Sequence, residues 1–540
     1  RASRFASGAP LHAIVRHPND LSGGPYPLAL LLHGNHGNCR TRLYDISGVD
    51  PSRDDACVVT NTGACPGSAE VTPNAEGLAG LAETLASHGY IVASVDANAV
   101  NCRDGRRGTR ADGYIAQRAL LLIEHLRRWR AWNSPEGAEP FAAAFAGHVD
   151  LGHAVLFGHS RGAEAVAAVP VALAAADDVD GIAVASVFSL APTNFDNPQP
   201  GAVPFATLVP VCDGDVFTYD GVQVYDRTLH HADDSAPAAQ IFLGHANHDY
   251  FNSEWRFDDN GFGVNSCEAD ALDTPEIQQR SLEVIVPAWF DGTARAEGVV
   301  EPWLRASGDV PPGVALHVDR GGALDWRRSY SAPRAARVDD FEDADAMHNL
   351  LGGAWSASGG FAAMSPATCT GTSTPACDRA YSVRMPTGTL RFGWPHHNPF
   401  SVTPPRAAYA LDWSAGDAVA TATLAADGSY DASSFRVLSL RVASRASTLN
   451  AGNTDADFTV RLVDADGHDA SARASEVTAV PHLYPSVYPR AVLQTLRFSL
   501  AGLAARGSID LHRLQRVELA TSAEGHDHGS LLVSDVEFAE

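Results

Sequence analysis

A serine flanked by two glycines stands in the stretch VLFGHSRGAEA, which has the pattern G-x-S-x-G at Gly158, Ser160 and Gly162. A strand-like apolar run precedes this pattern and a helix-like segment follows it. A serine on a sharp strand-to-helix turn is presented for attack on a carbonyl carbon, and glycines on both sides let the strand and helix approach closely. The alternative is an ordinary serine in a tight turn. The setting favours Ser160 as a nucleophile.

Polar residues also follow three other apolar runs. The run LALLL leads into HGNHG, FATLVPV leads into CDGD, and QIFL leads into GHANH. The acidic residues of the second segment are Asp213 and Asp215, and the third segment carries His245 and His248. Serine, then acid, then histidine is an order in which a base and its orienting carboxylate can serve a nucleophile. These four segments are therefore candidates for one catalytic site.

With these motifs, residues 1–305 resemble the α/β-hydrolases, and most closely their secreted branches without a lid, namely dienelactone-hydrolase-like, cutinase-like and platelet-activating-factor-acetylhydrolase-like esterases. The resemblance implies Ser160 as nucleophile, His248 as base and Asp215 as acid. Asp213 is the second choice of acid, and His245 is expected to lie outside the catalytic set. Either aspartate alternatively forms only a local turn.

The resemblance also implies an oxyanion hole made of the backbone N–H groups of Asn35 and Arg161. A shift of one residue would replace Asn35 by His36 as the donor. Two fixed donors aimed at a developing oxyanion lower the barrier by several kcal/mol. One departure is the charged Arg161 directly after the serine, where polyester hydrolases usually carry an uncharged residue. This departure weighs against a polyester substrate.

The elements expected to position these residues alternate between strands and helices. Expected strands are 12–16, 28–32, 90–95, 153–157, 181–190, 205–211 and 239–243, and expected helices are 77–88, 115–132, 163–176 and 274–290. Apolar runs of this kind are typical of buried parallel strands covered by helices. We therefore expect an α/β fold with a doubly wound, mostly parallel sheet of the α/β-hydrolase type.

The pattern changes after a Gly- and Pro-rich segment at residues 306–314, which is typical of a linker. Short alternating segments follow at 435–442, 458–462, 493–499, 514–519 and 531–538. They predict an all-β jelly roll or β-sandwich. The expected domains are thus 1–305 for catalysis and 315–540 as an accessory module, which we expect to bring the enzyme to its substrate. The latter resembles carbohydrate-binding modules.

Acidic residues mark both ends of this β-domain. If the first and last strands lie side by side, Asp340, Glu342 and Asp535 could meet around a structural Ca²⁺, a cation that prefers oxygen ligands. Solvated acidic ends are an equally good interpretation. No metal or organic cofactor is expected for catalysis.

Bulk properties narrow the class of protein. The chain has 540 residues and a formal net charge of −25, which disfavours nucleic acid and anionic membranes as partners. No apolar run is long enough to span a bilayer. Eight cysteines without a CxxC pair favour disulfides and a secreted or periplasmic location. We expect the pairs Cys212–Cys267 and Cys369–Cys377, whereas the pairing of Cys39, Cys57, Cys65 and Cys102 stays open.

The leading interpretation is a secreted serine esterase that forms an acyl-enzyme on Ser160. Its ester substrate is a small molecule or belongs to a polymer such as a polyester or an esterified glycan. Two alternatives remain. One is a lipase or peptidase that uses the same residues, and the other is a catalytically inactive protein that only binds a ligand. The sequence does not predict an oligomeric state.

Overall fold

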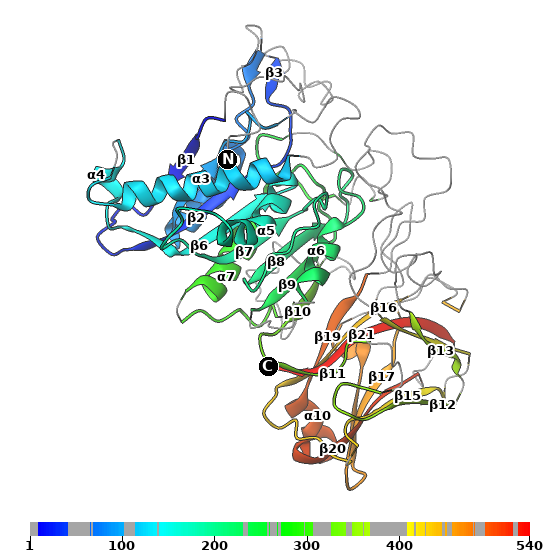
Figure 1. Cartoon of the computed structure of the whole chain (residues 1–540). Coiled ribbons are helices and arrows are strands. Elements are labelled where there is room, and N and C mark those ends of the chain that lie inside the picture. Colours follow the sequence, from blue (N-terminus) through cyan, green and yellow to red (C-terminus); the bar gives the residue numbers. More distant parts are fainter. Residues whose placement is uncertain are drawn as a thin grey trace. The chain divides into compact units, whose positions relative to one another are not determined.

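A computed structural model describes most of the chain, and Figure 1 shows its elements. The described residues are 9–41, 65, 69–101, 114–137, 140–229, 236–255, 259, 267, 272–295, 297–305, 326–341, 348–359, 361–367, 408–414, 417–426, 428–444, 449–450, 456–478, 480, 492–521 and 528–540. The predicted linker 306–314 and Glu342 lie outside them. The chain divides into two compact units. The first comprises Arg1–Leu304, Asp309–Trp326 and Arg391–His397, and the second comprises Arg305–Gly308, Arg327–Leu390 and Asn398–Glu540.

An eight-stranded sheet carries the candidate catalytic residues. Its strand order is β1-β5-β2-β6-β7-β8-β9-β10. The strands are β1 (Ala13–Arg16), β2 (Tyr26–Leu32), β5 (Ile91–Val95), β6 (Val149–His159), β7 (Val184–Leu190), β8 (Phe205–Pro210), β9 (Ala238–Leu243) and β10 (Trp326–Ser331). The pairs β2–β5, β2–β6, β6–β7, β7–β8 and β8–β9 are parallel. The carboxyl ends of β6, β8 and β9 therefore point the same way, each followed by a segment with candidate residues.

Helices accompany this sheet. They are the short η2 (Glu76–Leu78) and then α2 (Ala79–Ser87), α3 (Ile115–Asn133), α4 (Ala142–Phe145), α5 (Arg161–Ala174), α6 (Asp220–Thr228) and α7 (Pro275–Ala294). Helices α3 and α5 pack against each other, and their buried residues Leu122, Leu126, Val166 and Val169 belong to one apolar core with the strands. Helix α7 begins as its sequence predicts, with Pro275 at its first position and the Thr274 side chain accepting a hydrogen bond from the Ile277 N–H.

The predicted fold class is wrong. Strand β1 pairs antiparallel with β5, so the sheet is mixed, and a hairpin of β3 (Cys39–Thr41) and β4 (Ala69–Val71) lies outside it. The described part of the chain holds 21 strands but only seven α-helices. The chain is therefore mostly β-sheet and is not a doubly wound α/β-hydrolase. The segment between β1 and β2 is short and contains prolines, so it cannot form the crossover helix that strict alternation of strands and helices requires. In addition, the second unit contributes many strands and few helices, which makes the chain as a whole mostly β-sheet.

The second unit contains two antiparallel sheets, as expected of a β-sandwich. Its strands are β11 (Ala335–Asp339), β12 (Trp355–Ser358), β13 (Phe361–Ala367), β14 (Ala408–Trp413), β15 (Val419–Thr423), β16 (Val437–Ser444), β17 (Thr459–Asp464), β18 (Asp469–Arg473), β19 (Gln494–Ser499), β20 (Leu514–Ala520) and β21 (Gly529–Ala539). One sheet has the order β13-β14-β21-β16-β19, with β11 also paired to β21, and the other has the order β12-β15-β20-β17-β18. Apolar side chains from both sheets share one core, which includes Leu440, Val460 and Val533. The 3₁₀ turns η3 (Ala474–Glu476) and η4 (Leu511–Arg513) and helix α10 (Leu500–Gly507) complete the unit.

Two disulfides join described residues, Cys39–Cys65 and Cys212–Cys267. The second pair confirms the prediction, and the first is one of the pairings that the sequence left open. Cys57, Cys102, Cys369 and Cys377 lie outside the described residues. Within the described part of the chain, none of the helices has the length and apolar character that crossing a bilayer requires.

Candidate active site

Ser160 occupies the turn between strand β6 and helix α5. Its backbone has φ 57° and ψ −125°, a conformation that costs a non-glycine residue energy and persists only where its surroundings enforce it. Hydrogen bonds enforce it here. The Ser160 N–H donates to the Leu190 carbonyl on β7, and the Ser160 carbonyl accepts from the N–H groups of Ala163 and Glu164. The predicted strand-turn-helix setting of Ser160 is therefore present.

The two glycines of the motif are required by close backbone approach. A Cβ atom on Gly158 would lie 2.3 Å from the Gly162 carbonyl oxygen, and one on Gly162 would lie 2.4 Å from the Leu32 carbonyl oxygen. Both separations are shorter than any tolerable contact. The G-x-S-x-G spacing thus allows strand β6, helix α5 and the end of β2 to pack directly against one another.

Gly34 brings the segment after β2 against the serine. A Cβ atom on Gly34 would lie 2.5 Å from Ser160 Cβ, so the two residues are in van der Waals contact. Asn35 follows Gly34, and Arg161 is the first residue of α5. Of the two predicted oxyanion donors, one thus follows the residue that contacts Ser160 and the other follows Ser160 itself. The Asn35 side chain also accepts a hydrogen bond from the buried Arg118 guanidinium at 3.3 Å.

The alternative donor, His36, has a different environment. Its ring stacks on the Trp255 indole with ring centres 4.8 Å apart, and its carbonyl accepts a hydrogen bond from the Asn101 side chain. His33 anchors the same segment. Its Nε2 accepts from the Ala97 N–H at 2.9 Å, so its Nδ1 carries the proton and donates to the Gly34 carbonyl at 2.9 Å. The buried His33 thus fixes the backbone around Gly34.

His248 and Asp213 form a buried hydrogen-bonded pair. The distance from His248 Nδ1 to Asp213 Oδ2 is 2.8 Å, and the two side chains are 2 % and 1 % exposed. The other oxygen of Asp213 accepts the N–H groups of Asp215 at 3.0 Å and Val216 at 2.6 Å. These bonds hold the carboxylate at the end of β8, facing the imidazole after β9. Asp213 therefore has the contacts of an acid that orients a catalytic histidine.

Asp215, the preferred acid of the sequence analysis, does not hold that position. Its side chain is 46 % exposed, and its Oδ2 lies 3.6 Å from His248 Nε2, the nitrogen opposite the Asp213 contact. The second-choice Asp213 is nearer the strand end and so reaches Nδ1 directly. His245 is half-buried, and its carbonyl accepts from the Asp273 N–H.

Acidic neighbours set the charge of His248. Burial lowers the pKa of His248, but the charge and hydrogen bond of Asp213, together with the charges of Asp215 and Asp249, outweigh burial. The pKa of His248 is consequently raised well above 6.5. A protonated imidazolium is favoured in this environment, so a basic, neutral His248 requires a pH above the usual histidine range.

His159 packs its ring against the imidazole of His248. It directly precedes Ser160, and its ring centre lies 4.8 Å from that of His248 and 4.7 Å from that of Trp255. Burial lowers its pKa well below 6.5, and the charge of His248 adds to that effect. A neutral His159 therefore packs as an aromatic group against His248, one residue before Ser160.

Two buried acids near the site were missed by the sequence analysis. Glu164 on α5 accepts hydrogen bonds from the Thr193 hydroxyl and the Asp196 N–H, each at 2.6 Å. Burial raises the pKa of Glu164 to about 7. Asp259 lies between the acid and histidine segments and accepts backbone N–H groups from both. Glu164 could have been noticed, because it is a carboxylate inside the apolar face of a helix. Asp259 could not, because the residues around it in the sequence form no distinctive pattern.

The proposed calcium ligands lie in the second unit. Strand β11 pairs with β21, with Asp339 opposite Val536, so Asp340 and Asp535 are near one another along the sheet. Each faces an arginine, Asp340 at 3.4 Å from Arg337 and Asp535 at 3.4 Å from the buried Arg441. Among the described residues, no group of three or more potential ligands could hold a metal ion. The ion pairs described for these two carboxylates are both with arginines.

Comparison with known proteins gives little. No family model matches the chain, and no curated protein matches it. Among solved structures, part of the chain is similar to the family 30 carbohydrate-binding module of a cellulosomal cellulase from Clostridium thermocellum. The identity is 14 %, the match covers 24 % of this chain and 73 % of that one, and the TM-score is 0.19. A score this low supports no conclusion about fold or function.

Proposed function

We propose that this protein is a serine hydrolase that cleaves carboxylic esters through an acyl-enzyme. The observation that supports this most is the strained Ser160 turn together with the hydrogen-bonded pair of His248 and Asp213, whose imidazole contacts the ring of His159 directly before the serine. A serine becomes a useful nucleophile only when an adjacent base accepts its proton. The base in turn needs a group that fixes its tautomer, and Asp213 would keep the proton on Nδ1 and leave Nε2 free to accept.

The proposed reaction has two steps. His248 accepts the Ser160 proton through Nε2 while Ser160 Oγ attacks the ester carbonyl, and the resulting imidazolium donates the proton to the departing alcohol. Water, deprotonated by the same imidazole, then hydrolyses the acyl-enzyme. The backbone N–H groups of Asn35 and Arg161 are the proposed donors to the oxyanion, a role supported by the contact between Gly34 and Ser160.

A location outside the cytoplasm is part of this proposal. The two described disulfides, Cys39–Cys65 and Cys212–Cys267, are typical of secreted or periplasmic proteins. The β-sandwich of the second unit is proposed to tether the enzyme to a polymeric ester. Tethering raises the local substrate concentration without a new catalytic contact.

The proposal is tested by labelling the protein with a fluorophosphonate and mapping the labelled peptide. Ser160 should carry the label, and Ser160→Ala should abolish both labelling and hydrolysis. Short acyl esters, long acyl esters, acetylated glycans, polyesters and peptides then define the substrate. Absence of labelling and of turnover on all of them would favour a ligand-binding protein without activity.

A further inference from the structure

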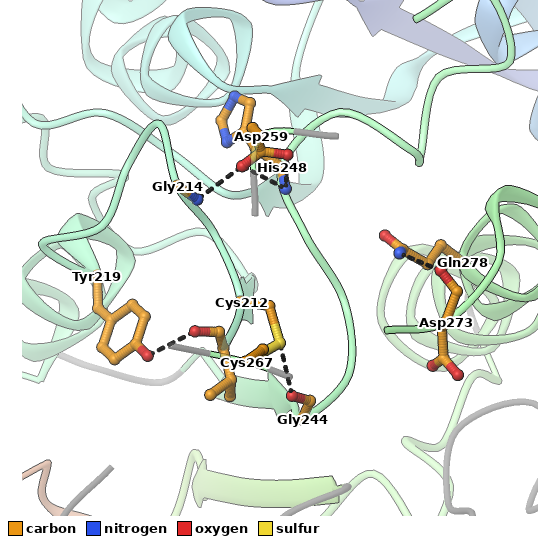
Figure 2. Close-up of a disulfide and its surroundings, with 10 residues drawn as sticks. Cys212, Gly214, Tyr219, Gly244, His248, Asp259, Cys267, Asp273 and Gln278 are labelled. Carbon is orange, nitrogen blue, oxygen red and sulfur yellow. Dashed lines mark hydrogen bonds between the residues drawn. A yellow bond between two sulfur atoms is a disulfide. The ribbon is translucent and has the colours of Figure 1, made fainter. Parts of the chain in front are cut away.

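The Asp259 carboxylate joins the two segments that carry Asp213 and His248. Its Oδ2 accepts the Gly214 N–H at 2.6 Å, and its Oδ1 accepts the N–H groups of His248 at 3.0 Å and Asp249 at 3.2 Å. Figure 2 shows Asp259 between Gly214 on one side and His248 on the other. One buried side chain thus bonds the residue after the acid and the backbone of the histidine itself.

We propose that Asp259 is a positioning residue that holds Asp213 and His248 in register, an inference that rests on the proposed hydrolase function. It does not touch the reacting atoms. Its effect is on the 2.8 Å bond between His248 Nδ1 and Asp213 Oδ2, because it fixes the backbone beside both partners. A catalytic pair displaced by about 1 Å can lose about 100-fold in rate.

The contact is shaped for a carboxylate. Both oxygens accept backbone N–H groups, Oδ2 from Gly214 and His248 and Oδ1 from His248 and Asp249. An ionised aspartate can accept at both oxygens, whereas the NH₂ group of an asparagine would face one of the N–H donors. Gly214 completes the fit, since a Cβ there would lie 1.9 Å from the Asp259 carbonyl oxygen. Only a glycine at position 214 therefore lets the acid segment approach Asp259 this closely.

The buried carboxylate of Asp259 lies in an electrostatically unfavourable place. Burial raises the pKa of Asp259 to about 7, the nearby Asp213 raises it in the same direction, and His248 and the Gly214 N–H oppose them. A buried carboxylate beside another carboxylate is unfavourable unless its hydrogen bonds compensate. The three backbone donors provide that compensation, and all of them belong to the acid and histidine segments.

Other links between these segments do not replace this one. The Cys212 N–H donates to the Ala246 carbonyl at 2.9 Å, and Cys212 is joined to Cys267. These links act before Asp213 in the chain, whereas Asp259 bonds the backbone after it, at Gly214. Asp259 also binds the His248 N–H.

Asp259→Asn tests the proposal, with Asp464→Asn as the matched control. Asp464, in the second unit, is also buried and also accepts three backbone N–H groups, from Asp466 and His468 at 2.9 Å and from Asp510 at 3.0 Å. Rates are counted per labelled Ser160, so a lower yield of folded protein does not change them. Asp259→Asn should lower kcat about 100-fold with KM little changed, whereas Asp464→Asn should lower only the Tm.

A second readout separates positioning from stability. The His248 Nδ1–H proton, followed by NMR of ¹⁵N-histidine-labelled protein, should shift or broaden in Asp259→Asn and stay unchanged in Asp464→Asn. An Asp259→Asn variant with a wild-type rate per labelled serine would overturn the proposal, and so would one that loses its folded structure by circular dichroism, because Asp259 would then serve folding alone. If wild-type Ser160 is neither labelled nor active, the hydrolase function itself fails, whatever Asp259 does.

Discussion

His248 lies between two aspartates, with Asp213 Oδ2 at 2.8 Å from Nδ1 and Asp215 Oδ2 at 3.6 Å from Nε2. The two contacts imply different roles. In the proposed hydrolase, a carboxylate on Nδ1 holds the tautomer that catalysis needs, while a carboxylate beside Nε2 lies where serine and substrate would approach. Asp213 thus both orients the imidazole and raises its pKa most, and Asp215 adds a smaller charge effect from the Nε2 side.

Asp213→Asn should therefore be far more damaging than Asp215→Asn. Loss of the carboxylate on Nδ1 favours the wrong tautomer and should lower kcat by about three to four orders of magnitude. Asp215→Asn should change kcat by about tenfold or less. Steady-state kinetics on the best ester of the substrate panel measure both. Equal losses in the two variants would show that the carboxylates share one role.

The pH profile should reflect the acidic surroundings of His248. Because its pKa is raised well above 6.5, the fraction of neutral base, and hence kcat/KM, should rise with pH and reach half its maximum above pH 6.5. Removing a negative charge disfavours the imidazolium, so Asp215→Asn should move this midpoint to lower pH. The exposed Asp466→Asn, in the second unit, should leave the midpoint unchanged. A wild-type midpoint at or below pH 6.5 would contradict the proposed electrostatics.

Gly34→Ala should impair the reaction through one added methyl group. The new Cβ would lie 2.5 Å from Ser160 Cβ, and the shift needed to relieve this contact would misplace the proposed oxyanion donor at Asn35. We expect a loss of about 100-fold in kcat. Gly152→Ala is the control, because its Cβ would meet only Asp150 Oδ1, at 3.3 Å. Comparable activity in both variants would remove Gly34 from the site.

The two interpretations of Asp535 differ in their response to chelation. Asp535→Ala removes the carboxylate that faces the buried Arg441 guanidinium and should cost about 3–5 kcal/mol of unfolding free energy. EDTA should leave the Tm of the wild-type protein unchanged. Calorimetry with and without the chelator measures both effects. A Tm that falls with EDTA and recovers with Ca²⁺ would restore the calcium interpretation.

The long elements could be predicted because their local patterns are strong. The apolar run before Leu32 and the helical spacing of α3 and α7 give elements close to the expected bounds, and Thr274-Pro275 marks the start of α7 correctly. Helix α6 was missed because Val222 and Val224 lower its helical propensity, and α10 because two glycines lie within its eight residues. The direction of β1 was not predictable, since an apolar strand reads alike in either direction.

The residues of the candidate site could be predicted only where their distance from the end of a strand decides whether they reach the site. Ser160 and His248 follow their strands at distances that a motif can capture. The choice between Asp213 and Asp215 depends on how the chain turns after β8, where two backbone N–H groups bind Asp213 and fix its direction. Asp259 reaches the site through tertiary packing, which leaves no local pattern.

Strand β21, the last strand of the β-sandwich, completes its sheet late in the folding of the second unit. Strand β21 pairs with β16 along one side and with β14 and β11 along the other, and it follows all three in the chain. During synthesis, strands β11, β14 and β16 therefore emerge from the ribosome before β21, the strand that pairs with all three. Pairings between distant parts of a chain form slowly, and until β21 emerges the edges of β11, β14 and β16 are open to other chains. We expect nascent forms lacking 529–539 to depend on chaperones.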